Sequence, residues 1–217
     1  MRKQSHSLGR ALGAASALAL LLSGNIFASE IHDAAAAGNL EKVRLLLKKN
    51  PASVNEKDKD GETPLHHAST SPEIVKLLIE HGGDVNARDK DNKTPLMYAA
   101  MLDGLEGARL LLAHKVEVNA KDNGGKTALH WAAFNGRKEV TELLIRNRAD
   151  VNERDNDGWT PLHKTASGNH PDVAEVLLKN KAEVDARNNV GQTPLASALQ
   201  NGEQAVADYL REHGGHE

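Results

Sequence analysis

The sequence predicts an all-α repeat solenoid of about six units, including a cap at each end. The first observation is a tetrapeptide, Thr-Pro-Leu-His or a close variant, that recurs at steps of 31, 33, 33 and 33 residues. Repeats of this period are typical of stacked supersecondary units. The second is composition: only 3% of residues are aromatic, which suits thin, repeated Ala/Leu layers better than one large core. The copies begin at Thr63, Thr94, Thr127, Thr160 and Thr193.

The first 28 residues lie outside the repeats and resemble an export signal. Arg2, Lys3 and Arg10 form a basic start, residues 11–22 are apolar and free of acids, and Ile26-Phe27-Ala28 completes the segment. This order predicts a secretory signal peptide with cleavage after Ala28, and hence a periplasmic or secreted protein. The apolar run is shorter than the roughly 20 residues that a membrane-spanning helix needs. An uncleaved anchor and an organelle transit peptide are the alternatives.

Charge and cysteine content exclude several classes of function. The net charge is −3, and it becomes −6 without residues 1–28, which hold three bases and no acid. No basic patch dominates, so a nucleic-acid partner is not expected. The chain has no cysteine, which excludes disulfides, thiolate catalysis and cysteine-ligated zinc.

The pattern of each repeat predicts two short helices. Thr127 is placed to cap the first helix, because its side-chain oxygen can accept a free backbone N–H. Sister repeats carry proline at the next position, where the missing donor is harmless. Ala132 and Ala133 allow neighbouring first helices to approach closely, and Gly136 ends the helix in a left-handed conformation. The second helix carries Val140, Leu143 and Leu144 on one face.

These residues resemble the ankyrin repeat, whose pattern is Gly-x-Thr-Pro-Leu-His-x-Ala-Ala, then Gly, Val-x-x-Leu-Leu and Ala-Asp-Val-Asn. The resemblance covers about residues 31–214. It implies pairs of antiparallel helices joined by β-hairpin fingers in a gently curved stack. After the signal peptide (1–28), the units are an N-terminal cap (29–60), four repeats (61–91, 92–124, 125–157 and 158–190) and a C-terminal cap (191–217).

One repeat departs from the pattern. The repeat that begins at Thr63 is two residues short at residues 69–72. Its first helix must therefore end early, or join the second helix through a tighter turn.

The histidines fit packing better than chemistry. His66, His130 and His163 occupy the histidine position of the repeat, and His32 takes the equivalent place in the cap; there the ring can bond to backbone between units. His81, His114 and His213 lie where second helices end, where a cation complements the helix dipole. The tail, His213 to His216, is a weaker metal-binding candidate. No carboxylate pair, nucleophile–base pair or phosphate loop recurs. We therefore expect no enzyme activity, no catalytic residues, no metal and no cofactor.

The aromatic and large apolar residues of the central repeats are the candidates for partner binding. In ankyrin proteins, fingers and first helices usually form the partner-binding concavity, and Trp and Tyr are favoured at interfaces. The alternative is that tryptophans at these places are partly buried packing residues. The candidates are Trp159, Phe134, Met101, Leu102, Tyr98 and Trp131.

The resulting hypothesis is a non-enzymatic, exported interaction module that binds an unidentified protein through its concave face and fingers. No nucleic acid, and no membrane span in the mature chain, is expected, and a monomeric scaffold is favoured. Some exported ankyrin proteins support oxidative-stress enzymes, and others act as immunity proteins. This chain resembles both groups only in its fold and its predicted export. The alternatives are a secreted effector that acts on host proteins and a histidine-based metal binder.

Overall fold

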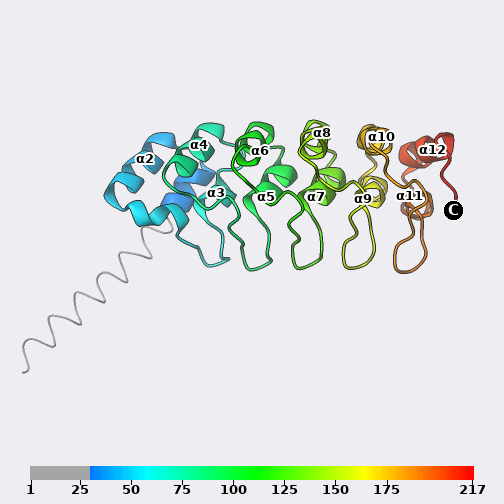
Figure 1. The fold of residues 1–217 in the computed structure, drawn as a ribbon, viewed down its shortest axis with the longest axis horizontal. Coiled ribbons are helices and arrows are strands. Elements are labelled where there is room, and N and C mark those ends of the chain that lie inside the picture. Colours follow the sequence, from blue (N-terminus) through cyan, green and yellow to red (C-terminus); the bar gives the residue numbers. More distant parts are fainter. Residues whose placement is uncertain (1–29) are drawn as a thin grey trace, which may run out of the picture.

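The computed structural model describes residues 30–217, which form an elongated stack of helix pairs (Figure 1). The first helix of each pair lies in one row, the second lies in a parallel row, and the connecting loops project along one edge. The N-terminal unit comprises helical residues 30–36, α2 (Leu40–Lys49) and the short 3₁₀ helix η1 (Pro51–Asn55). The pairs that follow are α3 (Pro64–His67) with α4 (Pro72–Glu80), α5 (Pro95–Leu102) with α6 (Leu105–Leu112), α7 (Ala128–Phe134) with α8 (Lys138–Arg146), α9 (Pro161–Gly168) with α10 (Pro171–Lys179), and α11 (Pro194–Asn201) with α12 (Gln204–Glu212).

The recurring threonine caps each first helix, as predicted. In α7, Thr127 and His130 form a reciprocal capping box, and α3 and α9 begin in the same way. In α5 and α11 the residue three positions after the threonine is not histidine. There the threonine oxygen alone accepts a backbone N–H, from Met97 and Ala196 respectively. The cap fixes where each helix starts and therefore keeps the units in register.

Small residues let the first helices stack closely. Ala99, Ala100, Ala132, Ala133 and Ala198 have no exposed surface. Leucines such as Leu129 and Leu144, also buried, fill the space between the two rows. The core is therefore a continuous layer along the stack, repeated unit by unit, with no single centre.

The repeat histidines connect consecutive units, which confirms their structural role. The backbone N–H of Thr127 donates to Nδ1 of His130, 3.1 Å away. Nε2 of His130 therefore carries the proton and donates to the carbonyl oxygen of Trp159, at 3.0 Å in the next unit. His66 bonds in the same way to Lys93, and His163 bonds to Gln192. His32 bonds to the carbonyl groups of Glu56 and Glu62.

The connecting loops lack the β-hairpin ladders that the resemblance implied. Among residues 30–217 no strand is formed. Each loop closes mainly at its base, as where the N–H of Asp155 donates to the carbonyl of Trp159 and Asp155 Oδ1 accepts the N–H groups of Asp157 and Trp159. Neighbouring loops are joined by single backbone bonds, such as Asn156 N–H to Gly124 O. The carboxylate thus takes up the N–H groups that a ladder would otherwise use, so a turn forms in place of a hairpin.

The short repeat has a short first helix, as predicted from its missing residues. Helix α3 has 4 residues, whereas α5 has 8. The chain then reaches α4 through the buried Ser69. A Cβ atom at Gly104 or Gly107, in the next unit, would lie 2.2 or 2.3 Å from the carbonyl oxygen of Ser69. The two glycines therefore make room for the backbone of the shortened connection.

The C-terminal tail is bonded to the last loop. Backbone N–H and Nδ1 of His216 lie 2.7 and 2.8 Å from the carboxylate of Asp185. In earlier units Asn152 and its equivalents join one loop to the next, and Asp185 takes that place in the last loop. The tail therefore occupies the position of a further loop and closes the end of the stack.

The predicted signal peptide, residues 1–28, lies outside the described residues. Along residues 30–217, none of the helices combines the length and the apolar character needed to cross a membrane.

Candidate functional site

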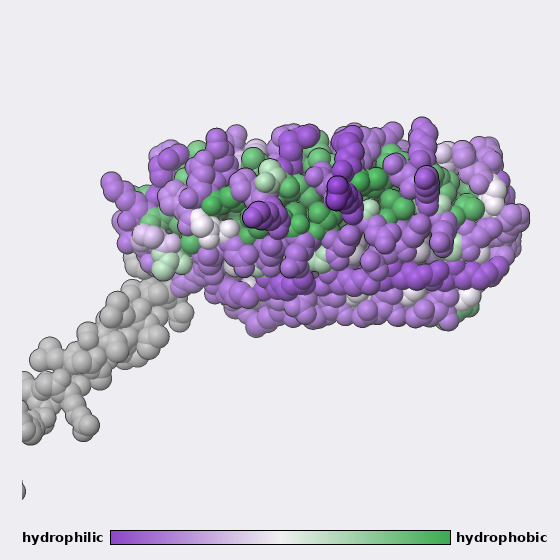
Figure 2. All heavy atoms as spheres, viewed as in Figure 1, coloured by the Kyte–Doolittle hydropathy of each residue, from purple (hydrophilic) through white to green (hydrophobic). Residues whose placement is uncertain are grey.

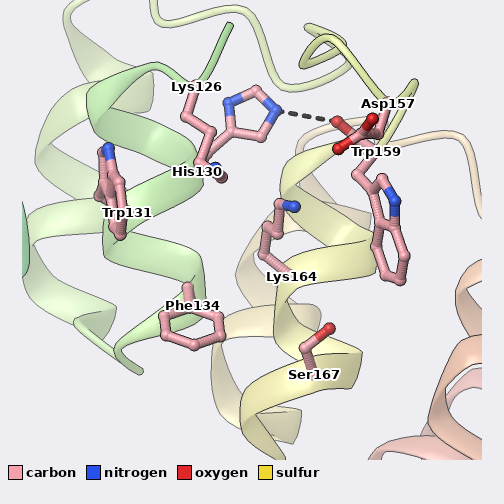
Figure 3. Close-up of a pocket in the computed structure, with 8 residues that line it drawn as sticks. All are labelled: Lys126, His130, Trp131, Phe134, Asp157, Trp159, Lys164 and Ser167. Carbon is pink, nitrogen blue, oxygen red and sulfur yellow. Dashed lines mark hydrogen bonds between the residues drawn. The ribbon is translucent and has the colours of Figure 1, made fainter. Parts of the chain in front are cut away.

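The central units form an open hollow between α7 and α9 (Figure 3). Its volume is about 450 Å³. Trp131 and Phe134 face it from α7, Lys164 and Ser167 from α9, and Trp159 from the loop before α9. Three of the six candidate residues, Trp131, Phe134 and Trp159, are therefore brought together around one depression.

Phe134 is the most exposed aromatic wall of this hollow. It is the last residue of α7, and 44% of its surface is exposed. Nearly half of the residue therefore faces solvent at the end of the helix. Figure 2 shows that hydrophilic residues cover the loop edge of the molecule, whereas apolar residues emerge over the helical rows.

Two lysines give the hollow a cationic character. Lys164 Nζ lies 4.8 Å from the ring centroid of Trp159, and Lys126 Nζ lies 5.4 Å from that of Trp131. Such contacts orient an ammonium group over an aromatic face. Lys164 also pairs at 2.8 Å with the buried carboxylate of Asp155. Burial alone would raise the pKa of Asp155, but the bonds from Lys164 and from the N–H groups of Trp159 and Asp157 outweigh it and lower that pKa.

Trp131 and Tyr98 also serve the fold. The indole N–H of Trp131 donates to Asp122 at 3.0 Å, and the hydroxyl of Tyr98 donates to Asp89 at the same distance. In each case the acid begins the loop and its partner follows nine residues later on the first helix. The hydrogen-bonding edge of each ring is thereby occupied, so only the apolar faces of these two residues remain for a partner. The single hydroxyl proton of Tyr98 is shared between Asp89 and Glu62 Oε1 of the preceding unit.

Met101 and Leu102 lie one unit away and do not line the hollow. Leu102 is 54% exposed at the end of α5, and Met101 beside it is half-buried. Arg137 of the next unit reaches this helix end, with its guanidinium 3.5 Å from the carbonyl oxygen of Met101. These two residues extend an exposed apolar strip toward the N-terminal side rather than deepening the same depression.

The polar walls of the hollow were not predicted from the sequence; they are Lys126, Lys164, Asp157 and Ser167. The sequence does indicate one of them by its position. Lys164 occupies the place that Trp131 holds in the preceding unit, nine residues after the acidic residue that begins the loop. A lysine where the two preceding units carry Tyr98 and Trp131 could have indicated a specialised surface.

His130 lines the hollow but is not placed for proton transfer. Both ring nitrogens are already bonded within the fold. Burial lowers the pKa of His130 to about 4, so the ring is neutral at physiological pH. The hollow therefore offers apolar faces and ammonium groups, which suit binding.

A family model described as ankyrin repeats (three copies) matches this chain three times, over residues 31–122, 89–155 and 129–217. Together the three overlapping matches extend over the whole helical stack.

Proposed function

Because the chain belongs to the ankyrin repeat family, whose members generally bind proteins and are typically non-enzymatic scaffolds, we propose that it is an interaction module whose partner occupies the hollow between α7 and α9. The carrying observation is the gathering of Trp131, Phe134 and Trp159 around one depression. Aromatic residues that keep an exposed face supply large contact areas at a small entropic cost. Buried Ala/Leu layers already stabilise the stack. We therefore assign the exposed Phe134 to partner binding and not to folding.

The two lysines define the chemistry of the partner. Lys126 and Lys164 place ammonium groups beside aromatic faces, but Lys164 is already paired with Asp155, so Lys126 is the better placed of the two to meet a partner carboxylate. A partner segment that carries an apolar side chain next to a carboxylate satisfies both features. The net charge of the chain without residues 1–28 is negative. The two lysines therefore form a local positive region that orients an approaching partner.

Export is part of the same proposal. The basic start, apolar run and Ile26-Phe27-Ala28 ending of residues 1–28 support a cleaved secretory signal. The partner is then a protein of the periplasm or of the surroundings of the cell. Support of an oxidative-stress enzyme and neutralisation of a toxin are two roles compatible with this address. A secreted effector acting on host proteins is the alternative, and it requires a second translocation step.

A photo-crosslinking amino acid introduced at position 134 tests the proposal in cells that express the chain. Leu45 on α2 is a matched control position, since it is an equally exposed apolar residue (51%) far along the stack. We expect a discrete crosslinked protein from position 134 and none of the same size from position 45. The same product from both positions, or from neither, contradicts a partner site at the hollow. Fractionation of the crosslinked cells tests export separately.

A further inference from the structure

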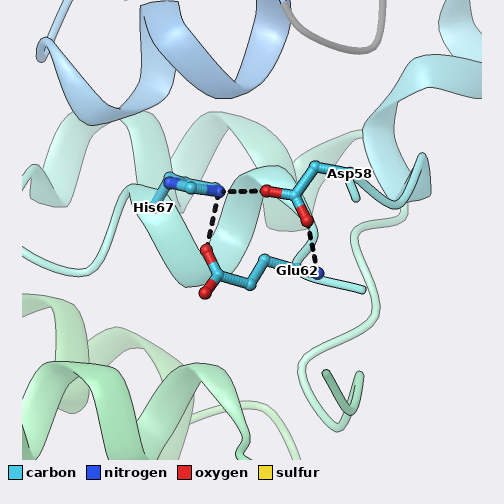
Figure 4. A group of neighbouring side chains, drawn as sticks. All are labelled: Asp58, Glu62 and His67. Carbon is cyan, nitrogen blue, oxygen red and sulfur yellow. Dashed lines mark hydrogen bonds and ion pairs between the residues drawn. The ribbon is translucent and has the colours of Figure 1, made fainter. Parts of the chain in front are cut away.

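Three potential metal ligands converge at the base of the loop before α3 (Figure 4). Asp58 and Glu62 come from that loop, and His67 is the last residue of α3. His67 Nε2 lies 3.0 Å from Asp58 Oδ2 and 2.9 Å from Glu62 Oε2. The three ligand atoms all lie within 4.8 Å of one another, the one such group among residues 30–217.

One oxygen of each carboxylate is engaged outside the cluster, so Asp58 Oδ2, Glu62 Oε2 and His67 Nε2 are the atoms that meet at its centre, and a bound ion would replace their mutual contacts. Asp58 Oδ1 accepts the backbone N–H groups of Asp60 and Glu62. Glu62 Oε1 accepts the hydroxyl of Tyr98 from the next unit. Outer contacts of this kind fix the orientation of metal ligands.

The cluster is specific to this unit. The position of His67 is held by Tyr98, Trp131 and Lys164 in the following units, and the position of Glu62 is held by Lys93, Lys126 and Trp159. None of those pairs combines an imidazole with two carboxylates. Packing of the repeat therefore does not require this residue combination, although the loop acid itself is a common feature.

We propose that Asp58, Glu62 and His67 bind a divalent first-row transition metal ion, with Zn²⁺ as the representative ion. Imidazole and carboxylate together suit such ions better than Mg²⁺ or Ca²⁺, which favour oxygen ligands alone. The two carboxylates balance the charge of the ion. The proposal is independent of the partner site, which lies in other units.

The spacing needs little adjustment. With bonds of about 2.1 Å, adjacent ligand atoms stand ~3.0 Å apart in octahedral geometry and ~3.4 Å apart in tetrahedral geometry. The two distances from His67 Nε2, 3.0 and 2.9 Å, match the first case and need an expansion of a few tenths of an ångström for the second, whereas the two carboxylate oxygens lie within 4.8 Å of each other. The side chains of Asp58, Glu62 and His67 are 19%, 19% and 24% exposed. An ion can therefore enter from solvent and keep water on its remaining positions.

A bound ion would tie the loop to α3 and, through Glu62 and Tyr98, this unit to the next. The shortened α3 has only 4 residues, so the unit has little helix of its own to hold that loop. Binding to the folded state alone would raise the melting temperature, and the stabilisation would grow with the logarithm of the free metal concentration above the dissociation constant.

Zn²⁺ titration of the untagged chain, by calorimetry, tests the proposal, with Co²⁺ absorption as a second readout of ligation. We expect one ion per chain, and affinity at least tenfold weaker in Asp58→Asn and in His67→Ala. Asp58→Asn is the sharper variant, because Asn188 holds the equivalent loop position and accepts the same two backbone N–H groups. The turn should therefore survive while the anionic ligand is lost, which circular dichroism verifies.

Two controls separate this site from other histidines. His114→Ala removes an exposed histidine on α6's C-terminal side, and the double variant His213→Ala with His216→Ala removes the tail. Both should bind Zn²⁺ as the parent does, whereas Tyr98→Phe should weaken binding about tenfold through loss of its bond to Glu62. Absence of Zn²⁺ binding, unchanged binding in Asp58→Asn, or loss of binding in the tail variant overturns the proposal.

Discussion

At the scale of single residues, the repeat histidines are held in one neutral form. The N–H of Thr127 points at Nδ1 of His130, so this nitrogen must stay unprotonated, and the proton resides on Nε2. Burial lowers the pKa of His130 to about 4, and burial also lowers the pKa values of His66 and His163. A protonated ring would set two N–H groups against each other inside the stack.

This arrangement predicts a pH-dependent stability. The pKa of His130 in the folded chain lies below the ordinary histidine value of 6.5, so the unfolded chain binds the proton more readily. The stabilisation is present above pH 6.5 and is lost as the pH falls toward 4. The free energy of unfolding in urea should fall over this range, with His130 contributing a slope of up to about 1.4 kcal/mol per pH unit.

His130→Ala should remove the contribution of His130 to the pH dependence of stability. It should also lower the free energy of unfolding at pH 7 by about 2–4 kcal/mol, because the backbone N–H of Thr127 and the carbonyl of Trp159 lose their hydrogen-bond partner. His114→Ala, at an exposed helix end, is the matched control and should change little. An unaltered pH slope in His130→Ala would show that the buried imidazole does not couple to folding.

At the scale of elements, the shortened α3 is accommodated by glycine in the following unit. Gly104 has an ordinary backbone conformation at the N-cap of α6, with φ −81°. Its lack of a side chain matters for space alone, since a Cβ would lie 2.2 Å from Ser69 O.

Gly104→Ala should therefore destabilise the fold by about 1–3 kcal/mol through overpacking. Glu203→Ala, at the N-cap of α12, is the matched control and should shift the urea midpoint much less. Equal midpoints for the two variants would mean that the connection at Ser69 can move aside at little cost.

The elements also show how far sequence predicts structure here. The threonine register predicted the first helices, their caps, the histidine bonds and the short α3, because these features recur at fixed positions. The bond from Asp122 to Trp131, and its counterparts nine residues apart, were not predicted, because the second partner changes chemically from unit to unit. The hollow was not predicted either. It depends on Lys164 and Phe134, which come from adjacent units, and their combination does not recur along the sequence.

At the scale of the whole molecule, the stack is a row of similar units joined to their neighbours, and the two proposed sites lie where units differ. The hollow lies where α7 and α9 carry Phe134, Lys164 and the loop residue Trp159. The carboxylate–histidine cluster lies where α3 is shortened. Repeated residues maintain the scaffold, and the exceptions to the repeat distinguish this chain from another stack of equal length.

The dissociation constant of the complex between this chain and the partner crosslinked at position 134 decides whether the partner binds between α7 and α9. The chain holds two tryptophans, Trp131 and Trp159, and both line the hollow, so their emission reports its occupancy. We predict that Phe134→Ala raises the dissociation constant tenfold or more, a loss of about 1.4 kcal/mol, while Leu45→Ala leaves it unchanged. Equal dissociation constants for the two variants would contradict a partner site between α7 and α9.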